Sequence, residues 1–330
     1  MKILIIGLGS IGQRHVQTME KVINARFIYF PSEMPVREAD FIQKHGIDVF
    51  QTLDECVRQH PDFAIIANAT PGHISIAKVL VENNIPFMIE KPVAISLVDL
   101  DELCEKINKQ RLQVLVGFQL RHHPTFNLLQ EIVDSGQIGT PLLFHGYVGQ
   151  YLPDWRPQKD YRETVSASKS LGGGVLADIC HEFDIAVTLL GPVSTISADL
   201  DRLSDLAIDT EDIANLSLVH KNRCHTNIHL NYLDRKYTWQ SRLVGSEGTI
   251  LWDYTKGFLE LTLSGQKNTK VIYDPPDFSR KQLFEKQAKH WLAVLSGTEQ
   301  SLVSFEDGCE ITKLIVAANA SSKNRAPITL

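Results

Sequence analysis

The segment that most constrains the fold is a short apolar run that leads directly into a glycine-rich hexapeptide. Residues 2–6 read KILII, a pattern typical of a buried strand, and residues 7–12 read GLGSIG. In a G-x-G-x-x-G between a strand and a helix, the first glycine makes the tight turn, the second lets a pyrophosphate approach the backbone, and the third lets the helix pack on the strand. The segment therefore predicts dinucleotide binding by Gly7, Gly9 and Gly12, with Ser10 and Ile11 between them.

The choice between NAD and NADP depends on the end of the second predicted strand. An acidic residue about 20 positions after the glycines would accept the ribose hydroxyls and favour NAD. Glu33 lies 21 residues past Gly12, and Ser32 before it leaves room for a 2′-phosphate. A solvated loop carboxylate is an equally good interpretation of Glu33, so the cofactor stays open as NAD or NADP.

The first 118 residues alternate strand-like and helix-like segments, which predicts β-α units on a parallel sheet. Two helix starts carry a capping box, Thr52 with Glu55 and Ser96 with Asp99. The predicted strands after the first are residues 26–30, 63–67, 86–90 and 113–117.

After residue 120 closely spaced strand-like runs replace this alternation and predict a largely antiparallel sheet. The expected strands are residues 141–149, 213–220, 223–233, 237–245 and 257–263, and the expected helices are 123–135, 175–190, 279–296 and 306–321, with an irregular stretch at 150–171. The fold class is α/β, with a Rossmann dinucleotide-binding domain at 1–120. An α+β domain on an open, mainly antiparallel sheet follows at 121–330.

Composition excludes several classes of protein. A chain of 330 residues has the length of about two domains, and its formal net charge of −6 argues against a nucleic-acid partner. The five cysteines form no C-x-x-C pair, which favours reduced thiols and a cytoplasmic location. No apolar stretch is long enough to predict a membrane span or a signal segment.

Three further motifs lie in order along the chain. They are NATPGH at residues 68–73, EKP at 90–92, and GGGVLAD at 172–178 followed by His181. Together with the glycine loop they resemble the family of glucose-fructose oxidoreductase, inositol dehydrogenase and MocA over essentially the whole chain. The resemblance implies hydride exchange between a nicotinamide and a carbinol carbon of a sugar or cyclitol. It also implies a homodimer or homotetramer formed through the open sheet.

The resemblance extends the cofactor site beyond the glycine loop. The further cofactor-binding residues that it implies are Asn68, Thr70, Pro71, His73, Glu90 and Lys91.

The chemistry requires a base, because a secondary alcohol that loses hydride becomes a carbonyl only if its hydroxyl proton also leaves. The resemblance makes Lys91 that base, aimed by a cis peptide before Pro92. Desolvation or a nearby positive charge would lower the pKa of such an amine from its usual value near 10.4. A surface lysine beyond a strand end is the alternative interpretation.

Asp178 and His181 complete the expected proton-handling group. At positions i and i+3 near the start of a helix, both side chains are predicted to reach one ligand. His181 exchanges a proton near neutral pH, while Asp178 orients it or binds substrate hydroxyls. In the family the two residues commonly lie at positions i and i+4, so the spacing of Asp178 from His181 departs from the family pattern. The alternative is an aspartate that interacts with the dipole at the start of the helix and a histidine that packs against the core.

Substrate contacts are expected from two segments. Arg121 and His123 follow the last predicted β-α unit, where interdomain salt bridges are an equal alternative. The stretch 150–162 offers flat rings and cations for a sugar or an anion, namely Tyr151, Trp155, Arg156 and Arg162. This stretch resembles a branch found in bacterial surface-sugar gene sets, which implies an acidic or nucleotide-linked amino sugar.

No metal is expected, although His225, Asn227 and His229 alternate along one predicted strand. A polar face of the open sheet explains them better, because no cysteine pair or E-x-x-H accompanies them. Two other functions remain open: glycoside cleavage assisted by transient oxidation, and a non-catalytic dinucleotide-binding regulator.

Overall fold

The computed structural model describes residues 1–31, 38–276 and 278–330, and divides them into two compact units. The first unit comprises Met1–Arg121 and Ser279–Thr312, and the second comprises His122–Phe278 and Lys313–Leu330. The first segment of the first unit ends one residue after the division expected at residue 120. Residues 279–312, however, pack with the first unit and not with the second. Ser32 and Glu33 lie outside the described residues.

The first unit is built on a six-stranded parallel sheet with the order β3-β2-β1-β4-β5-β6. Its strands, in chain order, are β1 (Lys2–Ile6), β2 (Arg26–Phe30), β3 (Asp48–Val49), β4 (Phe63–Ile66), β5 (Phe87–Ile89) and β6 (Val114–Val116). The central strands are buried on both faces, as expected where helices cover a parallel sheet. The predicted dinucleotide-binding topology is therefore confirmed. The two-residue β3 was not predicted, because it is too short to show a pattern.

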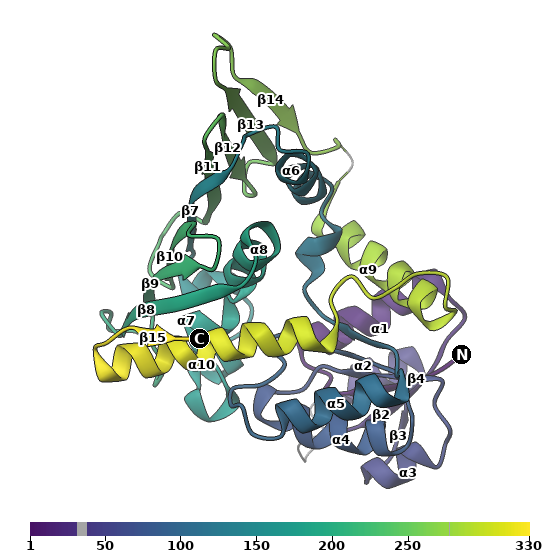
Figure 1. Cartoon of the computed structure of the whole chain (residues 1–330). Helices are drawn as coiled ribbons and strands as arrows, with labels where there is room; N and C mark the ends of the chain where they lie inside the picture. Colours follow the sequence, from purple (N-terminus) through teal and green to yellow (C-terminus); the bar gives the residue numbers. More distant parts are fainter. Residues whose placement is uncertain (32–37, 277) are drawn as a thin grey trace. The chain divides into compact units, whose positions relative to one another are not determined.

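Helices cover both faces of this sheet (Figure 1). Right-handed crossovers place α1 on the opposite face from α4 and α5, because the chain leaves β1 and β4 in opposite directions across the sheet. The helices of the unit are α1 (Ser10–Val22), α2 (Ala39–His45), α3 (Leu53–Val57), α4 (His73–Glu82), α5 (Leu100–Gln110) and α9 (Arg280–Leu295).

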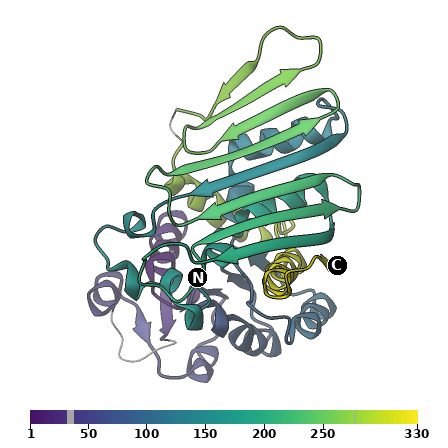
Figure 2. The ribbon, with the colours of Figure 1, turned by 90° about the vertical axis from the view of Figure 1, so that its left-hand side faces the viewer.

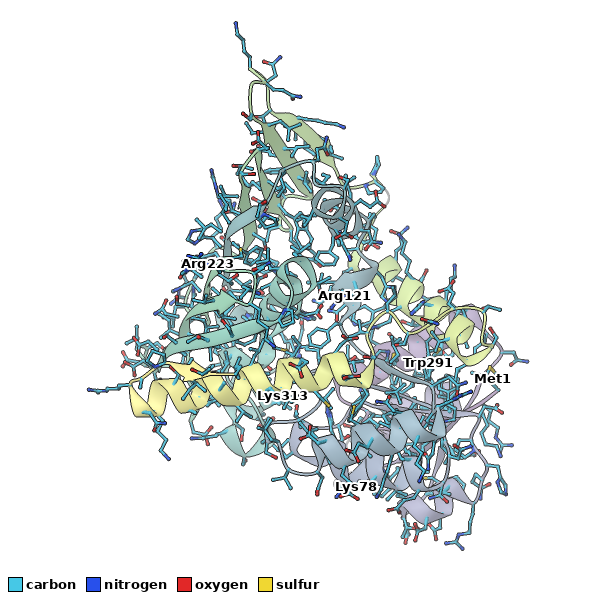
Figure 3. The ribbon with its side chains drawn as sticks, in the orientation of Figure 1. Met1, Lys78, Arg121, Arg223, Trp291 and Lys313 are labelled. Carbon is cyan, nitrogen blue, oxygen red and sulfur yellow. The ribbon has the colours of Figure 1, made fainter. Side chains whose placement is uncertain are left out.

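Helix α9 returns from the far end of the sequence to pack on α1. Its Trp291, labelled in Figure 3, is fully buried with its ring centroid 5.9 Å from that of Phe63 on β4. Phe284 lies against His15 of α1, at 5.9 Å between centroids. These buried rings explain why residues 279–312 belong to the first unit.

The two predicted capping boxes have different outcomes. Thr52 Oγ1 accepts a hydrogen bond from the Glu55 amide, and the Glu55 carboxylate accepts one from the Thr52 amide, so this box is confirmed. The box predicted at Ser96 is wrong, because α5 begins at Leu100 after Asp99, which has a φ of 66° and makes no side-chain cap. Ser96 is exposed in the preceding loop.

The second unit is built on a nine-stranded sheet with the order β14-β13-β12-β11-β7-β10-β9-β8-β15. All pairings are antiparallel except β10 with β7, which confirms the mainly antiparallel prediction. The strands are β7 (Pro141–Gly149), β8 (Val193–Asp201), β9 (Ile213–His220), β10 (His225–Asn231), β11 (Thr238–Gly245), β12 (Gly248–Asp253), β13 (Phe258–Leu263), β14 (Lys270–Tyr273) and β15 (Ile328–Thr329).

One face of this sheet packs on the helices of its own unit, and Figure 2 looks onto the other face. The exposed face is polar and carries His225, Asn227 and His229, as predicted. His229 stacks on Tyr147 at 5.1 Å between ring centroids, and its Nδ1 lies 2.7 Å from Asn215 Oδ1.

The helices of the second unit are α6 (Pro124–Asp134), α7 (Val175–Asp178), α8 (His181–Leu190) and α10 (Phe305–Asn324), which begins in the first unit.

The structure corrects the prediction of a single helix at residues 175–190, because α7 and α8 are separate helices. Ile179, with φ −106° and ψ 29°, interrupts the helical backbone. The amides of Val175 and Leu176 are held by Glu211, which anchors α7 separately from α8.

Within the described ranges, no helix combines the length and apolar character needed to cross a bilayer. The irregular stretch at 150–171 contains short 3-10 turns at Leu152–Trp155, Tyr161–Glu163, Val165–Ala167 and Lys169–Leu171.

Replacing Thr52 by Ala should lower the free energy of unfolding of the first unit by about 1 kcal/mol, because one orphan amide of α3 loses its acceptor. Urea unfolding followed by circular dichroism measures the change. Ser96→Ala serves as the control and should leave the midpoint unchanged. An equal loss in both variants would contradict the helix boundaries given above.

Candidate functional site

The glycine loop after β1 has the geometry that a diphosphate needs. Gly7 has a φ of +87°, and a Cβ there would lie 2.5 Å from the Asn68 backbone. A Cβ on Gly12 would overlap the Gly7 carbonyl oxygen. Gly9, in contrast, has open space where its Cβ would be. Close packing thus requires glycine at positions 7 and 12. At position 9 the missing side chain leaves open space, which forms a cradle for a ligand.

Helix α1 presents its first turn to this cradle. Gly9 is its N-cap and provides no side-chain cap, and no acidic residue occupies the first turn. The first amides of a helix lack intrahelical acceptors and carry partial positive charge, so they favour an anion. Ser10 and Ile11 form the start of this turn. These residues fit the pyrophosphate of a dinucleotide.

The loop after β4 lies against the glycine loop through Asn68, which is half-buried. Thr70 and Pro71 follow in the 3-10 turn Thr70–Gly72, with Thr70 buried and Pro71 exposed. This loop therefore presents Asn68 and Pro71 beside the carboxyl end of the sheet, where open α/β sheets bind their ligands.

His73, predicted to contact the cofactor, has backbone partners in the structure. It is 1% exposed, with Nε2 3.0 Å from the Asn68 carbonyl oxygen and Nδ1 3.1 Å from that of Pro92. Burial lowers the pKa of His73. Its ring joins the loops that follow β4 and β5.

Glu90 and Lys91 follow β5 directly. The Glu90 amide donates to Ile66 of β4, and its carboxylate lies 2.7 Å from His15 Nε2. Lys91 is half-buried, and the Lys91-Pro92 peptide is cis, as predicted. The structure thereby places the proposed base in the same unit as the glycine cradle.

Asp178 is held by a tyrosine that the sequence did not single out. Tyr232 follows β10, is fully buried, and donates its hydroxyl to Asp178 Oδ2 at 2.6 Å. Burial raises the pKa of Tyr232 well above 10, and the charges of Asp178 and Glu211 raise it further. The hydroxyl therefore stays protonated and orients the carboxylate. A single buried tyrosine at a strand end carries no motif, so only the fold identifies it.

His181 begins α8, whereas Asp178 ends α7, so the expectation that both lie on one helix is corrected. The His181 ring is 6% exposed and lies 5.8 Å from the Trp239 ring. Trp239 donates from Nε1 to Glu182 Oε1 at 2.5 Å. One tryptophan thus contacts both the imidazole and a buried acid.

Glu182 is a second group that sequence reasoning missed. It is 0% exposed, and its carboxyl also accepts from the Ser241 hydroxyl at 3.5 Å. Burial raises the pKa of Glu182 to about 7, although both hydrogen bonds oppose the shift. A charged residue beside His181 looks like a solvated helix position in the sequence, and only the sheet packing buries it.

The first pair of predicted substrate residues lies where the chain passes from the first unit into the second. Arg121, labelled in Figure 3, is half-buried at the end of the first segment of its unit. His123 is 1% exposed, accepts from the Thr125 amide as the N-cap of α6, and packs 4.6 Å from the Phe278 ring. The structure gives His123 a capping and packing role.

The four residues of the loop have different surroundings. Trp155 and Arg156 line one small cavity, and the Trp155 ring lies 5.2 Å from that of Tyr232. The Arg235 guanidinium covers the Tyr151 ring at 3.5 Å. Arg162 is exposed and bonded to Asp160. Trp155 therefore reaches Asp178 indirectly: its ring contacts Tyr232, and the Tyr232 hydroxyl donates to Asp178.

Comparisons with known proteins agree with this geometry. The model described as "Oxidoreductase family, NAD-binding Rossmann fold" matches residues 1–118, and that of the "GFO/IDH/MocA C-terminal domain" matches residues 126–251. The chain belongs to the GFO/IDH/MocA oxidoreductase family. It is an NAD-binding oxidoreductase by this membership, and the resemblance found in its motifs is confirmed.

Two curated relatives span nearly the whole chain. The myo-inositol 2-dehydrogenase of Thermotoga maritima is 25% identical and covers 100% of this chain and 98% of its own length. The scyllo-inositol 2-dehydrogenase (NAD(+)) of Bacillus subtilis is 25% identical, with coverages of 99% and 95%.

Solved structures establish the same fold. Levoglucosan dehydrogenase in complex with NADH and levoglucosan is 18% identical, with a TM-score of 0.88 and coverages of 100% and 99%. An Agrobacterium radiobacter oxidoreductase in complex with NAD+, L-tartaric acid and magnesium is 21% identical, with a TM-score of 0.84 and coverages of 100% and 98%.

Tyr232→Phe should lower kcat/KM about 10-fold, because Asp178 loses a hydrogen bond of the charge-assisted kind. Steady-state kinetics with a substrate that the wild-type protein converts measure the effect. The matched control is Tyr147→Phe, which removes a 3.1 Å hydrogen bond to Asp234 on the exposed sheet face. Equal kinetics for both variants would remove Tyr232 from the site.

Glu182→Gln should change how stability depends on pH. The folded pKa of about 7 lies above the unperturbed value of 4.5, so unfolding releases a proton between these values. The contribution of Glu182 to stability therefore falls as pH rises from 4.5 to 7, by at most about 3 kcal/mol, and is level above 7.

In Glu182→Gln this fall should be absent, while Glu131→Gln at an exposed position of α6 should behave as wild type. Urea unfolding at pH 5 and pH 7.5 compares the three proteins. An unchanged pH dependence in Glu182→Gln would show that the burial of Glu182 is misassigned.

Proposed function

We propose that this protein is an NAD-dependent dehydrogenase that oxidises a secondary alcohol of a sugar or cyclitol to the ketone, or catalyses the reverse reduction. The observation that carries the proposal is the placement of Lys91 at the end of β5, in the unit that holds the Gly9 cradle. The inositol dehydrogenases and levoglucosan dehydrogenase named above support a polyhydroxylated substrate.

When bound, NAD would supply the hydride acceptor for oxidation and the hydride donor for reduction. Lys91 Nζ takes the hydroxyl proton during oxidation and returns it to the carbonyl oxygen during reduction. The glycine loop, with Asn68 and Pro71, orients the cofactor.

The second unit contributes further polar groups to the reaction. His181 forms a hydrogen bond with a substrate oxygen, and Asp178, oriented by Tyr232, accepts a hydrogen bond from a substrate hydroxyl. Trp155 and Arg156 offer a flat ring and a cation to the rest of the substrate, which suits a sugar that carries an acidic group.

We also propose that the protein acts in the cytoplasm as a homodimer or homotetramer. The absence of C-x-x-C spacing among its cysteines supports the location. The exposed face of the nine-stranded sheet, with His145 and Tyr147, supports self-association. Light scattering that finds a monomer at micromolar concentration would reject this assembly.

The decisive experiment is a panel of free and nucleotide-linked sugars and cyclitols, followed at the absorbance of reduced nicotinamide with NAD+ and with NADP+. We expect net NADH to accumulate with one substrate. Product formation without NADH would favour redox-assisted glycoside cleavage. Tight cofactor binding with no turnover on any compound would favour a regulator.

Lys91→Ala should lower kcat at least about 100-fold, the contribution of a positioned general base, while NADH binding stays within about twofold. Steady-state kinetics measure kcat, and a fluorescence titration with NADH measures its binding. Lys78→Ala is the matched control, since Lys78 (Figure 3) forms an ion pair with Asp99 on the outside of the same unit. Unchanged turnover in Lys91→Ala would remove this lysine from the mechanism.

A further inference from the structure

We propose that His15 and Glu90 are positioning residues, a buried pair that ties the backbone of Lys91 to the helix at the cofactor phosphates. The inference rests on the proposed function, in which Lys91 is the base. Neither residue of the pair is required to touch the substrate.

The pair joins segments that are 75 residues apart. His15 lies on α1, about one and a half turns after Ser10, and its Nε2 is 2.7 Å from Glu90 Oε1. His15 is 2% exposed and Glu90 is 8% exposed. A buried carboxylate requires a partner, because an uncompensated charge in the protein interior is strongly unfavourable. The imidazole supplies that partner.

The surroundings of Glu90 leave its side chain little freedom. A Cβ on Gly117, just after β6, would lie 2.9 Å from Glu90 Oε1 and 3.0 Å from its carboxyl carbon. On the other side, the His15 ring meets the edge of Phe284 of α9. The carboxylate is therefore enclosed by α1 and the end of β6, and the peptide that leads into Lys91 is fixed with it.

A second histidine holds the other side of Lys91. His73, near the start of α4, lies 3.1 Å from the Pro92 carbonyl oxygen. Lys91 thus sits between two buried attachments, one through Glu90 to α1 and one through Pro92 to α4. The titratable groups that face Glu90 are His15 and, at longer range, His73, whose pKa burial lowers and the Glu90 charge raises.

This arrangement gives the pair a role distinct from cofactor affinity. The first turn of α1 belongs to the glycine loop, and the same helix then fixes Glu90. A proton is transferred only over hydrogen-bond distance. If Lys91 is no longer held in place, kcat therefore falls while the affinity for the cofactor changes little. The pair of His15 and Glu90 therefore fixes the position of Lys91 relative to a bound dinucleotide.

The test compares Glu90→Gln, His15→Asn and His15→Gln with wild type, in the full-length protein. Because the contact is made by Nε2, the longer glutamine at position 15 reaches Glu90 and asparagine does not. We expect kcat to fall at least 10-fold in Glu90→Gln and His15→Asn, with NADH affinity within about threefold of wild type. The limb of the kcat–pH profile that Lys91→Ala removes should shift in both variants, and His15→Gln should restore much of the rate.

The matched control is the pair of His45 and Glu20 in the same unit, at 2.8 Å. His45→Asn and Glu20→Gln should leave kcat and its pH profile unchanged. A purely structural role for His15 and Glu90 would lower the thermal midpoint without moving the pH limb. Unchanged kcat and pH limb in Glu90→Gln, which keeps the shape of the side chain, would overturn the proposal even if His15→Asn fails to fold.

Kinetics of Lys91→Ala distinguish a failure of the proposed function from a failure of the positioning role. If Lys91→Ala retains turnover, the proposed function has lost its base and the pair has nothing to position. If Lys91→Ala is inactive while Glu90→Gln and His15→Asn retain wild-type kcat and pH profile, only the positioning role is rejected.

Discussion

The close approach of backbone to backbone at the glycine loop is the constraint on which the first unit depends. Gly7 meets the backbone of Asn68, and Gly12 meets the carbonyl of Gly7, so neither position has room for a Cβ. This contact brings the end of β1, the start of α1 and the loop after β4 together. The space left at Gly9 and the first amides of α1 are consequences of the same packing, and together they form an anion cradle.

Buried polar side chains then extend this constraint to the chemistry. In the first unit His15 and His73 hold the segments on either side of Lys91. In the second unit Tyr232 holds Asp178. Hydrogen bonds in a buried environment are expensive to leave unmade, so each of them fixes its partner more strongly than an exposed contact would.

The motifs of the chain were enough to predict its family, the parallel sheet and the cis peptide before Pro92. The strands at 26–30 and 141–149 begin and end as predicted. Local patterns failed where distant residues decide the outcome. The helix predicted at 175–190 breaks because Glu211 anchors its first turn, and Ser96 is not a cap because α5 starts later.

The sequence by itself determined that a dinucleotide-binding loop, a lysine before a proline and an aspartate close to a histidine occur in one chain. Spacing along the chain carries these signals. Only the tertiary structure decided that α9 joins the first unit, that Glu182 is buried with a raised pKa, that Tyr232 donates to Asp178, and that His15 pairs with Glu90. The physical reason is that burial and hydrogen bonding depend on residues far apart in sequence, which no local pattern records.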